Sequence, residues 1–131
     1  MHTLYLIRGV PGSGKSTFAQ KLRNSGIVDF VYEADQYFHN WGNYQFDPAR
    51  LPEAHNYCQT MCFEALKDGY NVAVSNTSTT EKEVEIYRKI AEETDANFVS
   101  LVVESRHNGK NVHDVPPEKI EQMKQRFSIK L

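Results

Sequence analysis

A glycine-rich stretch near the start of the chain contains the residue types that bind phosphate groups. The pattern G-x-x-x-x-G-K-[ST] is met by Gly9, Gly14, Lys15 and Ser16. In this pattern backbone N–H groups point inward around phosphates, the lysine reaches the β- and γ-phosphates, and the hydroxyl ligates Mg²⁺. The stretch therefore predicts a site for ATP and Mg²⁺. The metal is assigned to Ser16, and ATP binding to Gly9, Gly12, Ser13, Gly14, Lys15, Ser16 and Thr17.

The segments on either side of this loop have the periodicities that the pattern requires. Residues 3–8 form an apolar run typical of a short strand, and residues 15–25 place apolar side chains at helical spacing. The N-terminus of such a helix offers free N–H groups and the positive end of its dipole, which both favour an anion. An ordinary glycine-rich turn is the alternative, and the order of strand, loop and helix argues against it.

Beyond this helix, strand-like and helical segments alternate along the chain. Because helices separate the strands, we expect an α/β fold: a P-loop NTPase-type parallel sheet of about four strands with helices on both faces. The length of 131 residues suits one compact domain, 1–131. The letters TTEKE predict a capped, acidic start for the helix at 78–95. The predicted strands are 3–8, 27–35, 70–77 and 97–104, and the predicted helices are 15–25, 52–69, 78–95 and 116–131.

The composition indicates a globular protein with mixed charges. Hydrophobic residues make up 40% of the chain and charged residues 24%, and the formal net charge is -2. No overall basic field points to nucleic acid, although a local basic groove is compatible with these values. The absence of a leader or long apolar run predicts a cytoplasmic protein with no membrane partner.

Three residues that can bind a metal, His55, Cys58 and Cys62, share one face of a predicted helix. Because zinc patterns pair two ligand clusters, packing explains these residues better than metal binding does.

Asp35 is the candidate base. It follows the second predicted strand, and the carboxyl ends of parallel strands form the rim at which α/β proteins bind ligands. A hydroxyl that accepts a phosphoryl group needs a base to take or orient its proton, and a carboxylate near the phosphate-binding loop can do so. A helix cap or a solvated loop carboxylate is the alternative.

The third predicted strand ends without an acidic residue. Many P-loop proteins keep an acid there that holds Mg²⁺ through water, whereas this chain has Ser75 and Asn76. Neutral oxygens bind Mg²⁺ more weakly than carboxylates. Asn76 and Thr77 either hold a water or an acceptor group, or form a turn and cap that lead into the next helix. The sequence leaves both interpretations open.

The polar segment 104–116 is a candidate lid. It contains Arg106, Lys110 and Asn111 around a glycine. A mobile basic loop that closes over ATP would neutralise the transferring phosphoryl oxygens and exclude water. A solvated connector is the alternative. We favour the lid.

Five aromatic residues fall within residues 37–46, in the letters YFHNWGNYQF. Such a stretch either stacks on bases and forms a pocket for a single strand or a nucleoside, or simply covers the sheet. Because it leaves the second strand beside Asp35, we favour a place on the acceptor side. The predicted acceptor-side residues are Asp35, Tyr37, Trp41, Tyr44, Asn76 and Thr77.

Together these segments resemble the small P-loop kinases of the polynucleotide 5′-hydroxyl kinase type, both phage-type enzymes and animal kinase domains fused to ubiquitin-ligase-binding proteins. The likeness covers RGVPGSGKST, ADQYF, GNYQFDPARLPEAHNYC, VAVSNTST and KNVHDVPPEKIEQM. It implies that Lys15, Ser16 and Thr17 handle ATP and Mg²⁺ and that Asp35 is the base. The family's lid arginine falls at Lys110, where lysine keeps the charge but loses the two-pronged grip of a guanidinium.

The resemblance and the motifs predict a kinase that transfers the γ-phosphate of ATP to a hydroxyl, with Asp35, Lys15 and Lys110 as catalytic residues. The acceptor expected is a nucleic-acid 5′-hydroxyl, in single-stranded nucleic acid, or a nucleoside-like small molecule. The alternative is a nucleotide-binding interaction or regulatory module with little or no catalysis. Asp35 favours the kinase, whereas Ser75 and Lys110 favour the module.

Overall fold

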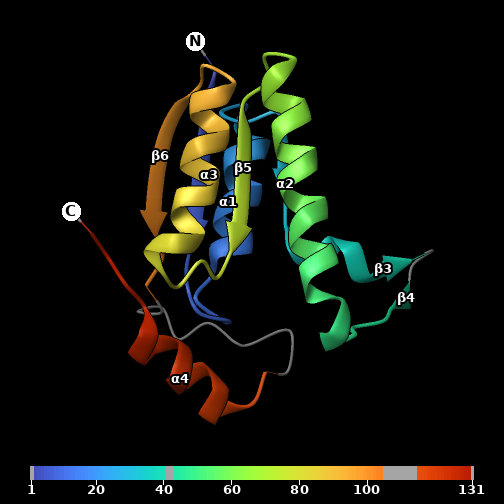
Figure 1. Cartoon of the computed structure of the whole chain (residues 1–131), viewed down its shortest axis with the longest axis vertical. Coiled ribbons are helices and arrows are strands. Elements are labelled where there is room, and N and C mark those ends of the chain that lie inside the picture. The colour runs from blue at the N-terminus through green and yellow to red at the C-terminus, as the bar shows by residue number, and fades with distance from the viewer. Residues whose placement is uncertain (1, 41–42, 105–114, 131) are drawn as a thin grey trace.

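The core of the protein is a four-stranded sheet in the order β2-β5-β1-β6, in which all neighbouring strands run parallel. It is seen in a computed structural model that describes residues 2–40, 43–104 and 115–130 (Figure 1). The predicted α/β fold with a parallel sheet is confirmed. The strands are β1 (Thr3–Arg8), β2 (Phe30–Tyr32), β5 (Val72–Asn76) and β6 (Asn97–Val102).

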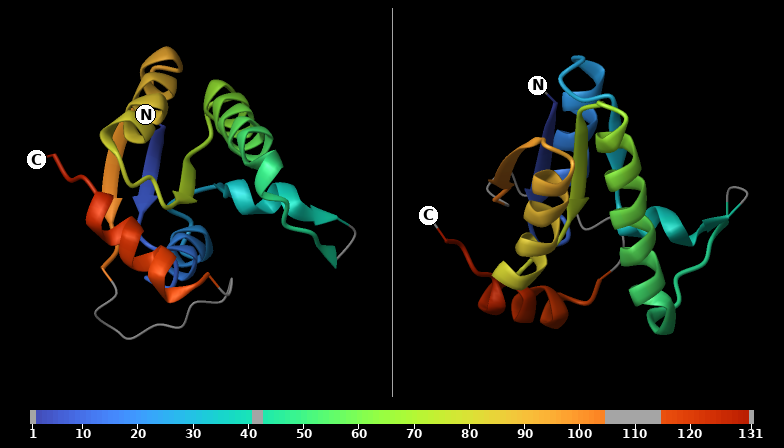
Figure 2. Two further views of the ribbon diagram at one scale, coloured as in Figure 1. Left: turned by 60° about the horizontal axis from the view of Figure 1, so that its bottom comes forward. Right: turned by 45° about the horizontal axis from the view of Figure 1, so that its top comes forward.

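Helices cover both faces of the sheet, as predicted (Figures 1 and 2). On one face lies α1 (Lys15–Asn24), whose Ala19 belongs to a buried cluster with Ile7 of β1. The other face is covered by α2 (Leu51–Lys67) and α3 (Glu81–Glu93), which share a second buried cluster with β1 and β5. Both clusters include residues of β1 because alternate side chains of a strand point to opposite faces.

The start of α3 has the cap that its sequence predicts. The Thr80 hydroxyl accepts a hydrogen bond from the Glu83 N–H, and the Glu83 carboxylate accepts one from the Thr80 N–H. This reciprocal box satisfies donors that the first turn of a helix leaves without partners.

None of the described helices combines the length and the apolar surface that crossing a bilayer requires.

The second strand is shorter than predicted: β2 spans Phe30–Tyr32, whereas the pattern indicated 27–35. The chain just before β2 completes the end of α1 instead, because its first N–H groups bond the Leu22 carbonyl. After β2 the chain turns into the 3₁₀ helix η1 (Ala34–Phe38), so Asp35 lies on this helix and not on a strand.

The segment between η1 and α2 contains short ordered pieces. A two-stranded antiparallel hairpin is formed by β3 (His39–Asn40) and β4 (Asn43–Tyr44). The 3₁₀ helix η2 (Pro48–Arg50) follows and leads into α2. The Asp47 carboxylate caps the start of η2 by accepting a hydrogen bond from the Ala49 N–H.

The last helix, α4, spans Pro117–Arg126 and ends before residue 131, where the prediction had placed its end. Arg8, at the end of β1, gives the reason. Its guanidinium donates a 2.5 Å hydrogen bond to the Ser128 carbonyl and lies 4.9 Å from the ring centroid of Phe127, which has an extended backbone. As a result, α4 lies below the carboxyl ends of the strands (Figures 1 and 2).

Candidate active site

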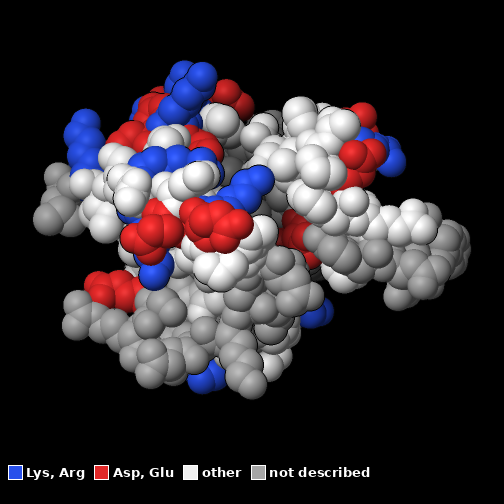
Figure 3. Space-filling model, turned by 90° about the horizontal axis from the view of Figure 1, so that it is seen from below, with Lys and Arg blue, Asp and Glu red and all other residues white. Residues whose placement is uncertain are grey.

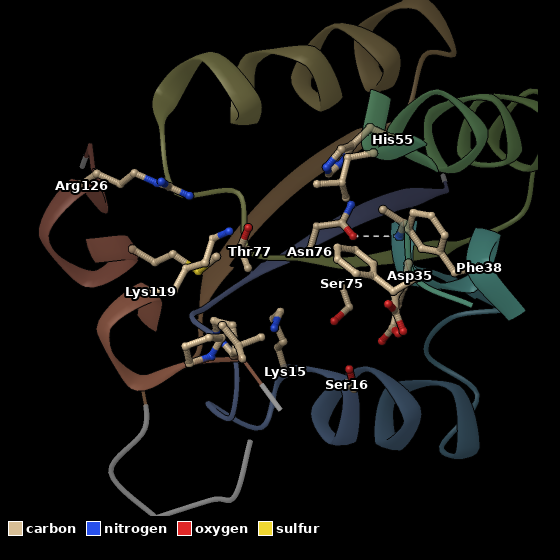
Figure 4. A pocket seen from close by; sticks show the side chains of 18 residues that line it. Lys15, Ser16, Asp35, Phe38, His55, Ser75, Asn76, Thr77, Lys119 and Arg126 are labelled. Atoms are coloured by element: carbon tan, nitrogen blue, oxygen red, sulfur yellow. Dashed lines mark hydrogen bonds between the residues drawn. The ribbon is translucent and has the colours of Figure 1, made fainter. Parts of the chain in front are cut away.

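A cavity of about 450 Å³ opens at the carboxyl ends of the strands (Figure 4). It lies between the glycine-rich loop, η1, the end of β5, the start of α2 and one side of α4. The sequence predicted a ligand site at this rim, because α/β proteins bind ligands at the carboxyl ends of their parallel strands. The residues that line the cavity include Lys15, Ser16, Glu33, Asp35, Phe38, Phe46, Leu51, His55, Ser75, Asn76, Thr77, Lys119, Met123 and Arg126.

Each glycine of the loop has a physical reason to be glycine. Gly12 and Gly14 have φ values of 83° and 95°, in the left-handed region. A Cβ on Gly9 would lie 2.3 Å from Oγ of Ser13 and 2.9 Å from the carbonyl oxygen of Val103, so a side chain does not fit there. The helix α1 begins directly after Gly14 without a side-chain cap. Its first N–H groups are therefore placed to receive an anion.

The residues predicted to bind ATP lie at different depths. Lys15 and Ser16 line the cavity with their side chains, whereas Ser13 is buried inside the loop. Thr17 is exposed and borders a separate surface groove on α1 together with Gln20. A direct contact of the Thr17 side chain with ATP stays a prediction.

Lys15 shares the cavity with two carboxylates. Burial lowers the pKa of its amine, and the negative charges of Glu33 and then of Asp35 oppose this shift. Asp35 was a predicted site residue and Glu33 was not. The alternation of an extended chain could have revealed it, because residues two apart point to the same side, and Glu33 has an extended backbone directly before η1.

Asp35 is positioned by the hydrogen bonds of η1. The Ala34 N–H donates to Oδ1 of Asn76 at 2.9 Å, and the Gln36 side chain donates to the Val31 carbonyl at 3.2 Å. The Asp35 carboxylate lies 3.6 Å from Nε2 of His39, one turn further along, and its side chain is 26% exposed. The carboxylate is therefore held at the cavity wall while it keeps access to a ligand.

Asn76 has a structural role that the sequence left open. Besides accepting from Ala34, its amide donates to the Tyr87 hydroxyl at 3.4 Å and to Sγ of Cys58 at 3.6 Å. The amide thus joins η1 to α2 and α3 at the end of β5. Asn76 also borders the cavity, and its contact with an acceptor stays a prediction.

Ser75 and Thr77 flank this amide on the cavity side (Figure 4). The Ser75 side chain is buried, and its hydroxyl oxygen has no hydrogen-bond partner among the described residues. The Thr77 carbonyl accepts a 3.3 Å hydrogen bond from the Gly9 N–H and so fixes the start of the glycine-rich loop. A predicted acceptor contact of Thr77 is compatible with the place of its side chain on the cavity wall.

The aromatic segment is divided between the cavity and the outer surface. Phe38 and Phe46 border the cavity and pack edge to face, with ring centroids 5.1 Å apart. Tyr37, expected on the acceptor side, is not among the residues that border it. Its hydroxyl donates to Glu53 and accepts from Arg50, each at 2.6 Å, on an exposed surface. This hydrogen bonding places Tyr37 toward η2 and α2.

Trp41 and the lid residues Arg106, Lys110 and Asn111 lie outside the described residues, and so does the side chain of Tyr44.

The helix α4 contributes a wall that the sequence analysis missed. Lys119, Met123 and Arg126 border the cavity, and their spacing of four and three residues places them on one helix face. That spacing was a signal available in the sequence. Arg126 also donates through Nε to the Thr79 hydroxyl at 3.2 Å, and Arg8 donates to the Ser78 carbonyl at 2.8 Å. The end of α4 is thereby attached to the loop after β5.

The molecular face that includes α4 is mixed in charge. Lys and Arg side chains are interspersed with Asp and Glu side chains over it, as Figure 3 shows. The cavity itself follows the same pattern, with cations from Lys15 and α4 and carboxylates from Glu33 and Asp35. This arrangement suits a ligand that carries both phosphate groups and a hydroxyl, since both kinds of charge have a counterpart.

The donor set of the cavity fits Mg²⁺ held jointly with phosphate oxygens. Mg²⁺ uses one or two protein carboxylates, substrate phosphates and several waters, and the cavity offers the Ser16 hydroxyl beside two carboxylates. In residues 2–40, 43–104 and 115–130, no three His, Cys, Asp or Glu side chains form a metal-binding group of their own.

Cys58 and Cys62 are buried free thiols, and burial raises the pKa of both.

Proteins with similar sequences include one human protein of much greater length. The chain is 30% identical over 132 residues to NEDD4-binding protein 2 of Homo sapiens, a match that covers 95% of this chain and 8% of that protein. It is 28% identical over 137 residues to an uncharacterized protein of Pasteurella multocida, covering 94% of this chain and 75% of that protein. The chain therefore spans a small part of its human relative.

Solved structures with a similar fold include kinases. The structure of the Pnkp1/Rnl/Hen1 RNA repair complex matches 96% of this chain and 44% of its own with a TM-score of 0.73 and 20% identity. The Mycobacterium tuberculosis APS kinase CysC in complex with AMPPNP and APS matches 92% of this chain and 67% of its own, with a TM-score of 0.60 and 21% identity. Residues 4–129, which contain the glycine-rich loop, η1 and α4, match the family model described as AAA domain, and the chain belongs to that family.

Proposed function

We propose that this protein is an ATP-dependent phosphotransferase that transfers the γ-phosphate to a hydroxyl acceptor. The observation that carries the proposal is the convergence of Lys15, Ser16 and Asp35 on one cavity. A phosphate-binding lysine and a carboxylate that can receive a proton are the two groups that transfer to a hydroxyl requires. The kinase fold of the structural neighbours is consistent with this chemistry.

Each wall of the cavity has a role in the proposed reaction. The N–H groups at the start of α1 and the Lys15 amine bind the β- and γ-phosphates. Asp35, held by η1, orients the acceptor hydroxyl and receives its proton. Lys119 and Arg126 face the cavity from α4 and neutralise charge on phosphate groups. Mg²⁺, when bound beside Ser16, would neutralise charge on the nucleotide phosphates.

For the acceptor we propose a nucleic-acid 5′-hydroxyl or a nucleoside-like molecule. Phe38, Phe46 and Leu51 give the cavity apolar lining, and Phe38 lies across the cavity from Lys119 and Arg126 of α4 (Figure 4). Aromatic side chains of this kind stack on bases, whereas cations bind phosphodiester groups. Similarity to the RNA repair complex supports this choice. Catalytic assistance from Lys110 remains part of the proposal.

The test is transfer of labelled γ-phosphate from ATP to a panel of 5′-hydroxyl RNA, 5′-hydroxyl DNA and nucleosides. We expect Asp35→Asn to reduce transfer by about 10²–10⁴-fold, the usual contribution of a general base. Its Kd for ATP should change less than about twofold, because the phosphates bind elsewhere. Asp68→Asn, at the exposed end of α2, is the matched control and should transfer at the wild-type rate. Equal rates for Asp35→Asn and wild type would refute the assignment of the base.

A nucleotide-binding interaction module is the second candidate, and Ser75 is the observation that favours it. Near the end of β5, the neutral hydroxyl of Ser75 occupies the place of the expected acid. A module of this class binds ATP but transfers no label to any acceptor, in the wild type and in Asp35→Asn alike. The same experiment therefore separates the two functions.

A further inference from the structure

Glu33 is a carboxylate on the cavity wall that the proposed reaction does not use. It is the last residue before η1 and has an extended backbone, with φ of -137° and ψ of 143°. Its side chain borders the same cavity as Lys15 and Ser16. Because Glu33 lies two residues before Asp35, the two carboxylates enter the cavity from one segment.

A second observation at this place points to a ligand. Ser75 is 3% exposed, and its hydroxyl oxygen has no hydrogen-bond partner among the described residues. Buried hydroxyl groups nearly always have one, from protein or from an ordered molecule. Figure 4 shows Ser75 around the same space as Lys15, Ser16 and Asp35. A polar ligand or ordered water therefore belongs between β5 and the start of α1.

The charges of this space favour a divalent cation beside a bound nucleotide. The negative charges of Glu33 and Asp35 both raise the pKa of Lys15, and Glu33 has the larger effect. Nucleotide phosphates bound at Lys15 would bring further negative charge toward both carboxylates. Repulsion between them is relieved by a divalent cation, and Mg²⁺ commonly combines phosphate oxygens, one or two carboxylates and several waters.

We propose that Glu33 positions the Mg²⁺ of the bound nucleotide, by accepting hydrogen bonds from waters on the metal, and so supplies the acid that the chain lacks at Ser75. The inference rests on the proposed nucleotide site, but it does not depend on the identity of the acceptor or on catalysis. The Ser16 hydroxyl is the direct ligand in this arrangement, and the Ser75 hydroxyl faces the waters.

The test is nucleotide binding with and without metal. Isothermal titration of ADP and AMPPNP in excess Mg²⁺ and in EDTA gives a ratio of two Kd values for each variant. We expect Glu33→Gln to lower the strengthening by Mg²⁺ by roughly tenfold or more, the usual effect of losing a group that orients metal-bound ligands. Its Kd in EDTA should be equal or lower, because a repulsive charge is removed. Glu64→Gln, on the exposed side of α2, is the matched control and should retain the wild-type ratio.

A restoring variant sharpens the test. Ser75→Asp combined with Glu33→Gln places a carboxylate at the buried hydroxyl and should recover most of the Mg²⁺ effect. Should the double variant not fold, as its melting curve would show, the comparison of Glu33→Gln with Glu64→Gln decides alone. An unchanged ratio in Glu33→Gln would overturn the proposal and leave Glu33 only as a negative charge that raises the pKa of Lys15.

The outcomes also separate this inference from the proposed function. A wild type that binds nucleotide with a Glu33-dependent Mg²⁺ effect but transfers no phosphate supports the metal role and refutes the phosphotransferase. A wild type that transfers phosphate with the same Mg²⁺ effect in Glu33→Gln does the reverse. A wild type that does not bind nucleotide refutes both.

Discussion

Replacing Asn76 by alanine tests whether the end of β5 supports the candidate base. The side chain is buried, and its carbonyl oxygen accepts a 2.9 Å hydrogen bond from the Ala34 N–H, directly before Asp35. Alanine keeps the Cβ but leaves this buried N–H without an acceptor, which costs about 1–3 kcal/mol. The bonds from the Asn76 amide to Tyr87 and Cys58 are long, at 3.4 and 3.6 Å, and add little.

We therefore expect Asn76→Ala to lower the free energy of unfolding by about 2 kcal/mol. For a domain of this size, that corresponds to a fall in melting temperature of roughly 6–10 °C. The phosphate-binding loop is built from β1 and α1, so the Kd for ADP should change less than about twofold. Phosphate transfer should fall by roughly tenfold to hundredfold, because a small displacement of a catalytic group has effects of that size.

Urea unfolding, calorimetric titration of ADP and the transfer assay measure these three quantities on one preparation. Asn24→Ala, at the exposed end of α1 where the side chain accepts a hydrogen bond from Gln20, is the matched control and should change none of them appreciably. The reasoning would be refuted by wild-type stability in Asn76→Ala. It would equally be refuted by an ADP affinity that falls as far as the transfer rate.

Two further predictions concern the loop and the apolar wall. Gly9→Ala places a methyl group 2.3 Å from Oγ of Ser13, so the loop must shift, and the Kd for ADP should rise tenfold or more; an affinity equal to wild type would contradict the steric argument. Phe46→Ala should raise the KM of a nucleic-acid or nucleoside acceptor by roughly fivefold or more and leave the KM of ATP nearly unchanged, since stacking contributes about 1–3 kcal/mol per base. Tyr70→Ala, an exposed aromatic residue that does not border the cavity, is its control, and equal changes in both KM values would argue against an acceptor wall.

The sequence predicted the parts of the fold that depend on local patterns. The glycine-rich loop, the strand before it and the helix after it are fixed by residue types at short spacing, and the alternation of strands and helices indicated the parallel sheet. The capped start of α3 follows from Thr80 and Glu83, which are three residues apart. In each case the residues that decide the structure are close together in the chain.

The parts that were missed depend on partners far apart in the chain. The amide of Asn76 is fixed by Ala34, 42 residues away, so its own neighbours could not show its role. The second strand is short because the chain before it bonds to Leu22 of the preceding helix. Glu33 and the face of α4 that carries Lys119 had usable spacing, but only the fold shows that both face one cavity.

Arg8 links the end of β1 to residues far along the chain, and this has a consequence for the order of folding during synthesis. Its guanidinium is 3% exposed and donates to carbonyls that lie 70 and 120 residues further along the chain. A buried cation without acceptors is strongly disfavoured. While the protein is being made, the end of β1 therefore stays incomplete until Ser128 has emerged from the ribosome. The loop that follows Arg8 thus reaches its native structure only after a segment 120 residues further along the chain has been synthesised.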